Sequence, residues 1–568
     1  MHRWPTLTLT LIVLYAAAAC APAPSVTQSR ETAASPANTQ PKRLVVAIMA
    51  EPPALHRALI PPGFVIQTGD VPDTIVNVGL SVTDNQSVRR PVLAETVPSL
   101  DNGLWELLPD GRMRLTWKIR PGAMWHDGTP FTADDLRFSA QIAQDPEFPE
   151  FRAQGLALLS GVEVVDGQTI ATLWKQPYIR ADRLFGTGSD TTVPPLPRHL
   201  LEDAAQTNKE GFRQLPYWTT AYVGVGPYKL QEWVAGSHFV LAANDNFVLG
   251  RPRIDQLEIR FILDADTLVA NILAGTVEAT IGTGLNLEQA LNASNQWREG
   301  RLNVAVDSWV FAAPQFINPD PTIVTDVRFR RALLQAVDRQ TLAEAIQAGL
   351  VPPASSPVRP NEAEYKEIVG AIRPYDYDPA SALRQLQDLG YTRGQDGVLQ
   401  NTSGRLSLEV RATASPAIHA KTMLPVADAW QRLGVDIQEV IIPVQRLTDL
   451  EYRTTHPAFE VVRYRSGAGN IEQLHGGQAP LPQNRFAGTN RSRYVNPEFD
   501  GLLDQYLATI PWAPRMQALS QVVGHITDQL NVMGLIYDVQ PALIGNRLLN
   551  VTDLNLTWSI NQWELTAK

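Results

Sequence analysis

The stretch LTWKIRPGAMWHDGTPFTADDLRF, residues 115–138, decides the fold, because most of its residues have a recognisable local task. Its first part alternates apolar and polar side chains, with Leu115, Trp117 and Ile119 as the apolar members. A period of two is typical of a strand that turns one face toward a core. We therefore predict a half-buried strand at the start of the stretch.

Two turns and a helix start follow this strand. The Pro-Gly pair ending at Gly122 suits a type II turn, because proline presets φ and glycine takes the positive φ. The Asp-Gly pair ending at Gly128 predicts a second turn. Thr132 can cap the next helix, with Asp135 as its acidic capping-box partner. The whole stretch is thus predicted to be a strand, two turns and a helix start.

This order of strand, RPG, HDG and PFTADD resembles the extracytoplasmic solute-binding proteins of peptide and nickel type, family 5, which deliver ligands to ABC importers. Three later blocks resemble the same family. Residues 223–279 contain VGVGPYKLQEW and LAGTVEA, residues 327–358 begin with VRFRRALLQAVDR, and residues 496–500 read NPEFD. In the first of these blocks we expect paired strands at 228–233 and 238–242, a strand at 257–262 and a helix at 266–274.

The resemblance implies an α/β protein with the two-lobed periplasmic-binding-protein fold, of type II and the large peptide-binding subclass, with an extra segment that enlarges one lobe. The chain segments we expect are a lipoprotein signal peptide at 1–20, a flexible tether at 21–43 and a solute-binding domain at 44–568. Within that domain we expect lobe I at 44–75, 190–305 and 535–568, an accessory lobe at 76–189, and lobe II at 306–534.

The first twenty residues have the layout of a secretory signal. Arg3 gives a short positive start, an apolar run follows, and small residues precede Cys20, the one cysteine of the chain. A cysteine after small residues resembles a bacterial lipobox, in which the thiol receives the lipid, although Ala17 stands where leucine is usual. We expect Cys20 to be the lipid anchor. The alternative is an ordinary cleaved signal that ends near a chance cysteine.

Composition and motifs exclude several other functions. The net charge of -10, without a basic run, argues against a nucleic-acid partner. HExxH, GxSxG and a P-loop are absent, so we expect no enzyme, no metal and no cofactor, and the importer's ATPase must be a separate polypeptide. His126 and Asp127 are adjacent and point apart, which favours turn chemistry over a catalytic pair.

Specificity is predicted to reside near residues 459–470, FEVVRYRSGAGN. Peptide-binding members of the family carry a W..D segment here, whose aspartate holds the ammonium group of the peptide, and this chain has no such aspartate. Tyr464 and Asn470 in this segment are candidate ligand-binding residues. Trp309 is a third candidate, because it precedes the block at 327 in an aromatic run.

Arg463 and Arg465 should share one face of the strand in this segment, with Tyr464 on the other. Two guanidinium groups at a cleft would suit a carboxylate or another anion, so both arginines are candidate ligand-binding residues. The alternative is that they are solvated or paired with nearby acids such as Glu460 and Glu472.

The function expected from the resemblance is that of the extracytoplasmic substrate-binding component of an ABC importer, which captures a peptide or similar small solute between two closing lobes. Its partners would be that solute, an ABC permease and a separate ATPase, and the protein would be a lipid-anchored monomer on the cell membrane. The alternatives are a secreted hydrolase, or a surface sensor or adhesin on the same scaffold that binds a non-peptide ligand.

Overall fold

The computed structural model describes residues 41–60, 71–84, 88–153, 155–187, 193–282, 284–552 and 556–566. Cys20, the predicted signal peptide and nearly all of the predicted tether lie outside the described residues. Among the residues that are described, no helix is both long enough and apolar enough to span a membrane.

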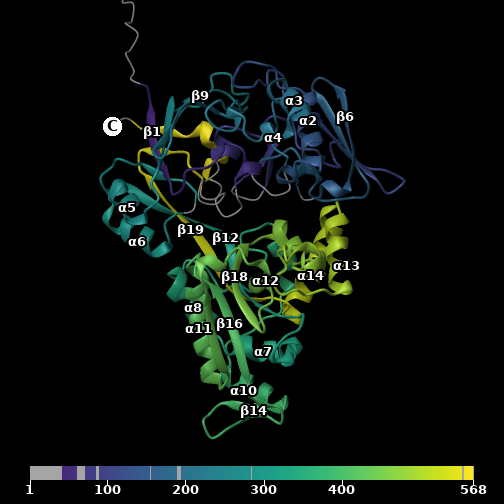
Figure 1. The fold of residues 1–568 in the computed structure, drawn as a ribbon, viewed down its shortest axis with the longest axis vertical. Coiled ribbons are helices and arrows are strands. Elements are labelled where there is room, and N and C mark those ends of the chain that lie inside the picture. The colour runs from purple at the N-terminus through teal and green to yellow at the C-terminus, as the bar shows by residue number, and fades with distance from the viewer. Residues whose placement is uncertain are drawn as a thin grey trace, which may run out of the picture. The chain divides into compact units, whose positions relative to one another are not determined.

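A ten-stranded mixed sheet runs through the described chain in the order β17-β16-β18-β12-β19-β11-β1-β10-β9-β8 (Figure 1). Its strands are β1 (Arg43–Ile48), β8 (Tyr228–Val234), β9 (His238–Ala243), β10 (Gln256–Phe261), β11 (Ala279–Thr280), β12 (Gly300–Pro314), β16 (Ser407–Thr413), β17 (Asp436–Ile442), β18 (Phe459–Arg465) and β19 (Met533–Gly545). β1 pairs in parallel with β10 and β11 and is almost wholly apolar, as strands covered on both faces usually are. The expected mixed α/β class is therefore confirmed.

The long strands β12 and β19 connect the two lobes. They pair antiparallel from Gly300 opposite Gly545 to Ala312 opposite Met533, with two register shifts on the way. Lobe I strands lie on one side of this pair in the sheet order, and lobe II strands lie on the other. Each lobe has its own apolar core around its part of the sheet. The two-lobed fold is thus confirmed, whereas the exact lobe boundaries stay a prediction.

The opening stretch lies in a second sheet, of order β4-β5-β7-β6, within residues 76–189, the segment predicted above to be the accessory lobe and called the accessory lobe below. Its strands are β4 (Trp105–Leu107), β5 (Met113–Lys118), β6 (Leu159–Asp166) and β7 (Thr169–Trp174). The side chains of β5 alternate as predicted, and Gly122 and Gly128 have φ of 80° and 90°. α2 (Ala133–Gln144) begins with the expected capping box, in which the Thr132 N–H donates to Asp135 Oδ2 at 2.9 Å. The local predictions for this stretch are confirmed.

The other helices cover the sheet faces and the two lobes. They are α3 (Arg198–Thr207), α4 (Lys209–Phe212), α5 (Ala265–Leu273), α6 (Leu287–Gln296), α7 (Val327–Gln335), α8 (Arg339–Gln347), α9 (Tyr365–Ile368), α10 (Pro379–Asp388), α11 (Ile418–Leu433), α12 (Leu450–Thr454), α13 (Pro497–Ala508) and α14 (Trp512–Gln529). The short strands are β2 (Ser81–Thr83), β3 (Arg89–Pro91), β13 (Thr392–Arg393), β14 (Leu399–Asn401), β15 (Gly404–Arg405), β20 (Leu548–Leu549) and β21 (Glu564–Leu565). The strands and helix predicted between 228 and 274 are confirmed as β8, β9, β10 and α5, each within about two residues.

Candidate functional site

A cavity of about 550 Å³ lies between the accessory lobe and lobe II. From the accessory lobe it is lined by residues of β2, β3 and β4, by residues 98–101, which precede β4, and by residues 179–183, which include the helical turn Ala181–Arg183. From lobe II it is lined by Gly469 and by residues at the end of α13 and the start of α14. Its volume is within the range of pockets that hold small ligands, roughly 300–1,000 Å³.

Beside this cavity, the accessory lobe and lobe II contact each other directly. The Ile179 N–H donates to the Leu507 carbonyl at 2.8 Å. Arg180 Nη1 lies 2.6 Å from a carboxylate oxygen of Glu472. These contacts join the accessory lobe to lobe II, so the cavity is lined by parts of the chain that are far apart in sequence.

Three arginines of the accessory lobe line the cavity: Arg89 from β3, and Arg180 and Arg183 from the helical turn Ala181–Arg183 and its N-cap. The Arg180 side chain is only 4% exposed. Burial lowers the pKa of Arg89 to about 10, with Asp182 raising it and the charge of Arg183 lowering it further. Burial also lowers the pKa of Arg183, and the charge of Arg180 adds to that effect. The three guanidinium groups are therefore close enough to repel one another.

The backbone of residues 467–469 lies close to these arginines, and glycines at 467 and 469 make this approach possible. Gly467 has φ of 108°, and its N–H donates to the Pro357 carbonyl at 2.7 Å. A Cβ atom on Gly469 would lie 3.1 Å from Arg183 Nη2, so the glycine leaves room for the guanidinium group. Asn470 is half-buried beside it and donates to the Ser466 carbonyl at 2.7 Å. The segment after β18 thus reaches the cavity wall, although ligand binding by Asn470 stays a prediction.

Arg463 is paired with two carboxylates. Its Nη2 lies 3.0 Å from Asp307 Oδ1 in β12, and its Nε contacts Asp538 in β19. Burial alone lowers the pKa of Arg463, but the two carboxylates outweigh burial and raise it. Arg463 therefore joins the strands that connect the lobes, and it lies outside the lining of the 550 Å³ cavity.

The alternative prediction, that these arginines pair with nearby acids, is correct for Arg463. Its partners, however, are not Glu460 and Glu472, the acids that the prediction named. Glu460 is bound by Arg491, whose Nη2 lies 2.6 Å from it, and Glu472 contacts Arg180. Arg465, at the end of β18, is exposed. Ligand binding by Arg463 and Arg465 stays a prediction.

Trp309 and Tyr464 lie next to each other on the opposite face of the sheet. Trp309 in β12 is opposite Tyr464 in β18 and Tyr537 in β19. Trp309 is 1% exposed and packs against Phe311, with ring centroids 4.6 Å apart. Both rings thus belong to one apolar cluster, and their contact with a ligand stays a prediction.

Sequence reasoning missed Arg89, Arg180 and Arg183. A signal for two of them was present, because Arg180 and Arg183 are three residues apart, a spacing that places side chains on one face of a helical turn. Nothing local links them to Arg89, which is about ninety residues earlier and reaches the cluster only through the pairing of β2 with β3.

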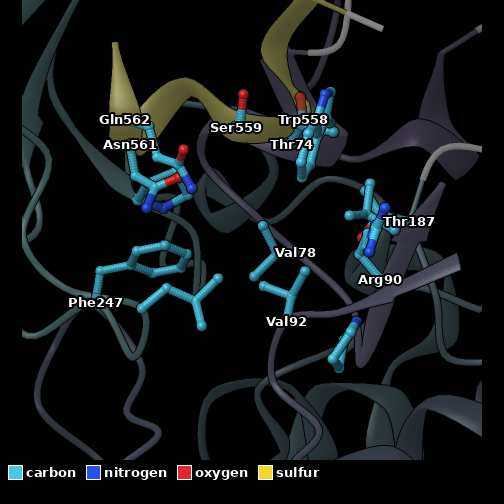
Figure 2. A pocket seen from close by; sticks show the side chains of 14 residues that line it. Thr74, Val78, Arg90, Val92, Thr187, Phe247, Trp558, Ser559, Asn561 and Gln562 are labelled. Atoms are coloured by element: carbon cyan, nitrogen blue, oxygen red, sulfur yellow. The ribbon is translucent and has the colours of Figure 1, made fainter. Parts of the chain in front are cut away.

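Two other cavities are less suited to a solute. One has a volume of about 40 Å³. Figure 2 shows its lining, in which Phe247, Val78 and Val92 face Trp558 and Asn561. That volume has room for a few water molecules only, since one water needs roughly 10–15 Å³ of such space. A cavity of about 470 Å³ lies wholly within lobe II, among residues of α8, α10 and α11. Of these three cavities among the described residues, only the 550 Å³ cavity combines a solute-sized volume with walls from the accessory lobe and lobe II.

Two lobes joined by paired strands, with a solute-sized cavity lined by segments far apart in the chain, define the architecture of a solute-binding protein. Residues 95–472 match the bacterial extracellular solute-binding proteins, family 5, and the chain belongs to this family. The oligopeptide-binding protein AppA of Bacillus subtilis is 25% identical over 439 residues, which is 75% of this chain and 74% of AppA. The heme-binding protein A of Haemophilus influenzae is 26% identical over 433 residues, 73% of each chain.

Solved structures show the same fold. AppA of Bacillus subtilis in complex with a nonapeptide superposes with a TM-score of 0.70 at 20% identity, covering 93% of this chain and 100% of AppA. NikA of Brucella suis in complex with Fe(III)-EDTA superposes with a TM-score of 0.73 at 17% identity, covering 92% of this chain and 100% of NikA.

Proposed function

We propose that this chain is the extracytoplasmic substrate-binding component of an ABC importer, and that it captures a peptide or similar small solute in the 550 Å³ cavity. The observation that carries the proposal is the placement of this cavity between the accessory lobe and lobe II, in a chain of the solute-binding family. The relatives named above bind an oligopeptide, heme and a metal chelate, so the scaffold serves several kinds of small solute.

Closure around the solute would follow from the way in which the lobes are connected. β12 and β19 lie side by side and are shared by both lobes, so a small change along these two strands moves one lobe relative to the other. A solute that contacts both walls of the cavity binds the closed form more tightly than the open form and shifts the population toward closure. Micromolar affinity would need about -8 kcal/mol in total.

The cavity wall carries charges of both signs, which suits a zwitterionic solute such as a peptide. Asp101 and Glu364 line it together with the three arginines. The carboxylates can hold an ammonium group and the guanidinium groups a carboxylate, because charge-assisted hydrogen bonds are the stronger ones.

The proposed cellular setting is the outer face of a membrane. Cys20 would carry the lipid anchor, residues 21–43 would act as the tether, and the loaded monomer would deliver its solute to a permease driven by a separate ATPase. Metabolic labelling with a lipid precursor tests the anchor, because Cys20→Ser should abolish incorporation while leaving the folded domain intact.

The solute-binding proposal is tested on the purified mature chain. We expect a decrease in the radius of gyration by small-angle scattering, and a change in tryptophan fluorescence, when a pool of short peptides is added. Mass spectrometry of the bound fraction then identifies the solute. If neither signal changes with peptides, heme or metal chelates, the proposed function is wrong.

A further inference from the structure

The pairing of β12 with β19 is interrupted at Asp307. Val306 lies opposite Val539 and Ser308 lies opposite Asp538, so Asp307 is an extra residue in β12 and forms a β-bulge. A bulge bends its strand and increases the local twist. The direction of β12 therefore changes at this residue.

The sheet loses a strand at the same place. β18 pairs with β12 from Phe459 opposite Pro314 to Arg465 opposite Ser308, where it ends. On the lobe I side, β11 joins β19 only at Ile544. Between these points the described sheet is a ribbon of β12 and β19 alone, and a two-stranded ribbon is less stable and more twisted than a wider sheet. The two lobes are thus joined by the part of the sheet that deforms most easily.

Arg463 of β18 holds the bulge from lobe II. Its Nη2 lies 3.0 Å from Asp307 Oδ1, and its Nε contacts Asp538 in β19. The Asp307 carbonyl also accepts the Ser466 N–H at 3.0 Å, and Gln347 Nε2 donates to Asp538 Oδ1 at 2.9 Å. One guanidinium group therefore connects both strands of the ribbon at the point where they change register.

The charges of this group are poorly accessible to solvent. The side chain of Arg463 is 12% exposed, and those of Asp307 and Asp538 are 21% and 11% exposed. Burial raises the pKa of Asp538, the charge of Arg463 lowers it, and the charge of Asp307 raises it. The two carboxylates thus repel each other across the ribbon, and the guanidinium group that contacts both keeps them together.

We propose that Asp307 is the pivot of lobe closure, and that Arg463 holds this pivot in the arrangement in which the accessory lobe and lobe II are in contact. This inference rests on the proposed function and adds the residues that set the balance between the open and closed forms. The contact of Arg180 with Glu472 is made in the same arrangement. Because Arg463 lies outside the cavity lining, it is a positioning residue, which acts on solute affinity through closure.

The experiment measures the distance between the accessory lobe and lobe II in the empty protein. Spin labels on Val165→Cys and Val495→Cys, which replace side chains that are 50% and 54% exposed, report this distance by pulsed electron paramagnetic resonance. Cys20→Ser removes the one native cysteine. For Arg463→Gln we expect a broader distribution with more long distances, because both carboxylates lose their cation. The ratio of closed to open molecules should fall by roughly 5- to 150-fold.

Two further variants separate the pivot from a general loss of stability. Arg463→Gln combined with Asp307→Asn removes one of the opposing carboxylates, so its distance distribution should return toward that of the wild type. Arg463→Lys keeps the positive charge but lacks the planar group that contacts both carboxylates at once. It should broaden the distribution less than Arg463→Gln, and it decides the question if Arg463→Gln does not fold: an unchanged distribution then overturns the proposal.

Arg411→Gln is the matched control. The side chain of Arg411 is 11% exposed, close to the 12% of Arg463, and it contacts Glu409 in the same strand, β16, within lobe II. The control should therefore leave the distance distribution as in the wild type, even if it lowers the melting temperature.

The unlabelled proteins are then dialysed against a random library of short peptides, and the bound peptides are quantified by mass spectrometry. Arg463→Gln should weaken every retained peptide by the same factor and leave their rank order unchanged. A changed rank order would show that Arg463 contacts the peptide, and would overturn its role as a positioning residue.

The remaining failures are separable. An Arg463→Gln distribution equal to that of the wild type overturns the pivot, and so does a double variant as broad as the single one. Equal broadening in Arg411→Gln also overturns it, because any loss of stability would then be sufficient. If no library peptide, heme or metal chelate binds to the wild type, the proposed function is wrong, while the distance measurement still decides whether Asp307 is the pivot.

Discussion

His419 in α11 is held in its neutral form by hydrogen bonds on both ring nitrogens. The backbone N–H of Arg463 donates to Nε2 at 2.9 Å, so this nitrogen carries no proton. Nδ1 lies 2.6 Å from Thr413 Oγ1, which can donate in turn to the Ser415 carbonyl at 2.8 Å. The neutral ring therefore donates from Nδ1, and a second proton on Nε2 would oppose the Arg463 N–H.

This geometry predicts a loss of stability in acid. Burial, followed by the charges of Arg463, Arg453 and Arg491, lowers the pKa of His419 from 6.5 to about 3. The stabilisation is complete above about pH 6.5 and is lost as the pH falls toward 3, because the unfolded chain then binds a proton that the folded chain excludes. Between about pH 7.5 and 5 the expected loss from this histidine is about 2 kcal/mol.

The test compares the wild type with His419→Gln in urea unfolding at about pH 7.5 and 5. The glutamine amide oxygen can still accept the Arg463 N–H but does not titrate. Other buried histidines titrate in both proteins and cancel, so the variant should lose about 2 kcal/mol less than the wild type. His238→Gln, which removes a half-buried histidine outside this network, is the control for the substitution itself. An equal loss in the wild type and in His419→Gln would refute the argument.

Three further changes test the packing around the site and the opening stretch. Glu460→Gln leaves the charge of Arg491 buried without its carboxylate, so the free energy of unfolding in urea should fall by about 3–5 kcal/mol, whereas replacing both residues by apolar ones should be much milder. Asp135→Ala removes the carboxylate that caps α2 and should lower the same free energy by about 1–2 kcal/mol. Gly128→Ala forces a side chain into φ of 90° and should cost about 1–2 kcal/mol, while Gly370→Ala, with open space and no such φ, should stay within about 0.5 kcal/mol.

The opening stretch could be predicted from sequence because its interactions are local. The alternation of β5, the positive φ at Gly122 and Gly128, and the bond between Thr132 and Asp135 all act within a few residues. Each of these features has a sequence signature that does not depend on the rest of the chain. The elements of the scaffold were therefore correct to within a residue or two.

The partners of Arg463 could not be predicted, because they depend on the register of three strands. Asp307 is 156 residues before Arg463, and Asp538 is 75 residues after it. The sequence reasoning therefore considered Glu460 and Glu472, which are near in sequence. Glu460 instead pairs with Arg491, and Glu472 contacts Arg180 of the accessory lobe.

The alternation of β18 also explains why Arg463 does not line the cavity. Arg463 shares its face with Val461 in the core of lobe II, where both carboxylates already neutralise it. The chain reaches the cavity only after the strand has ended, at Gly469, and there it contributes backbone and not charge. The positive charge of the cavity wall comes from the accessory lobe, in which Arg180 contacts the single carboxylate of Glu472. The segment that follows β18 thus reaches arginines about 280 residues earlier in the chain, and this meeting could not be predicted from either segment alone.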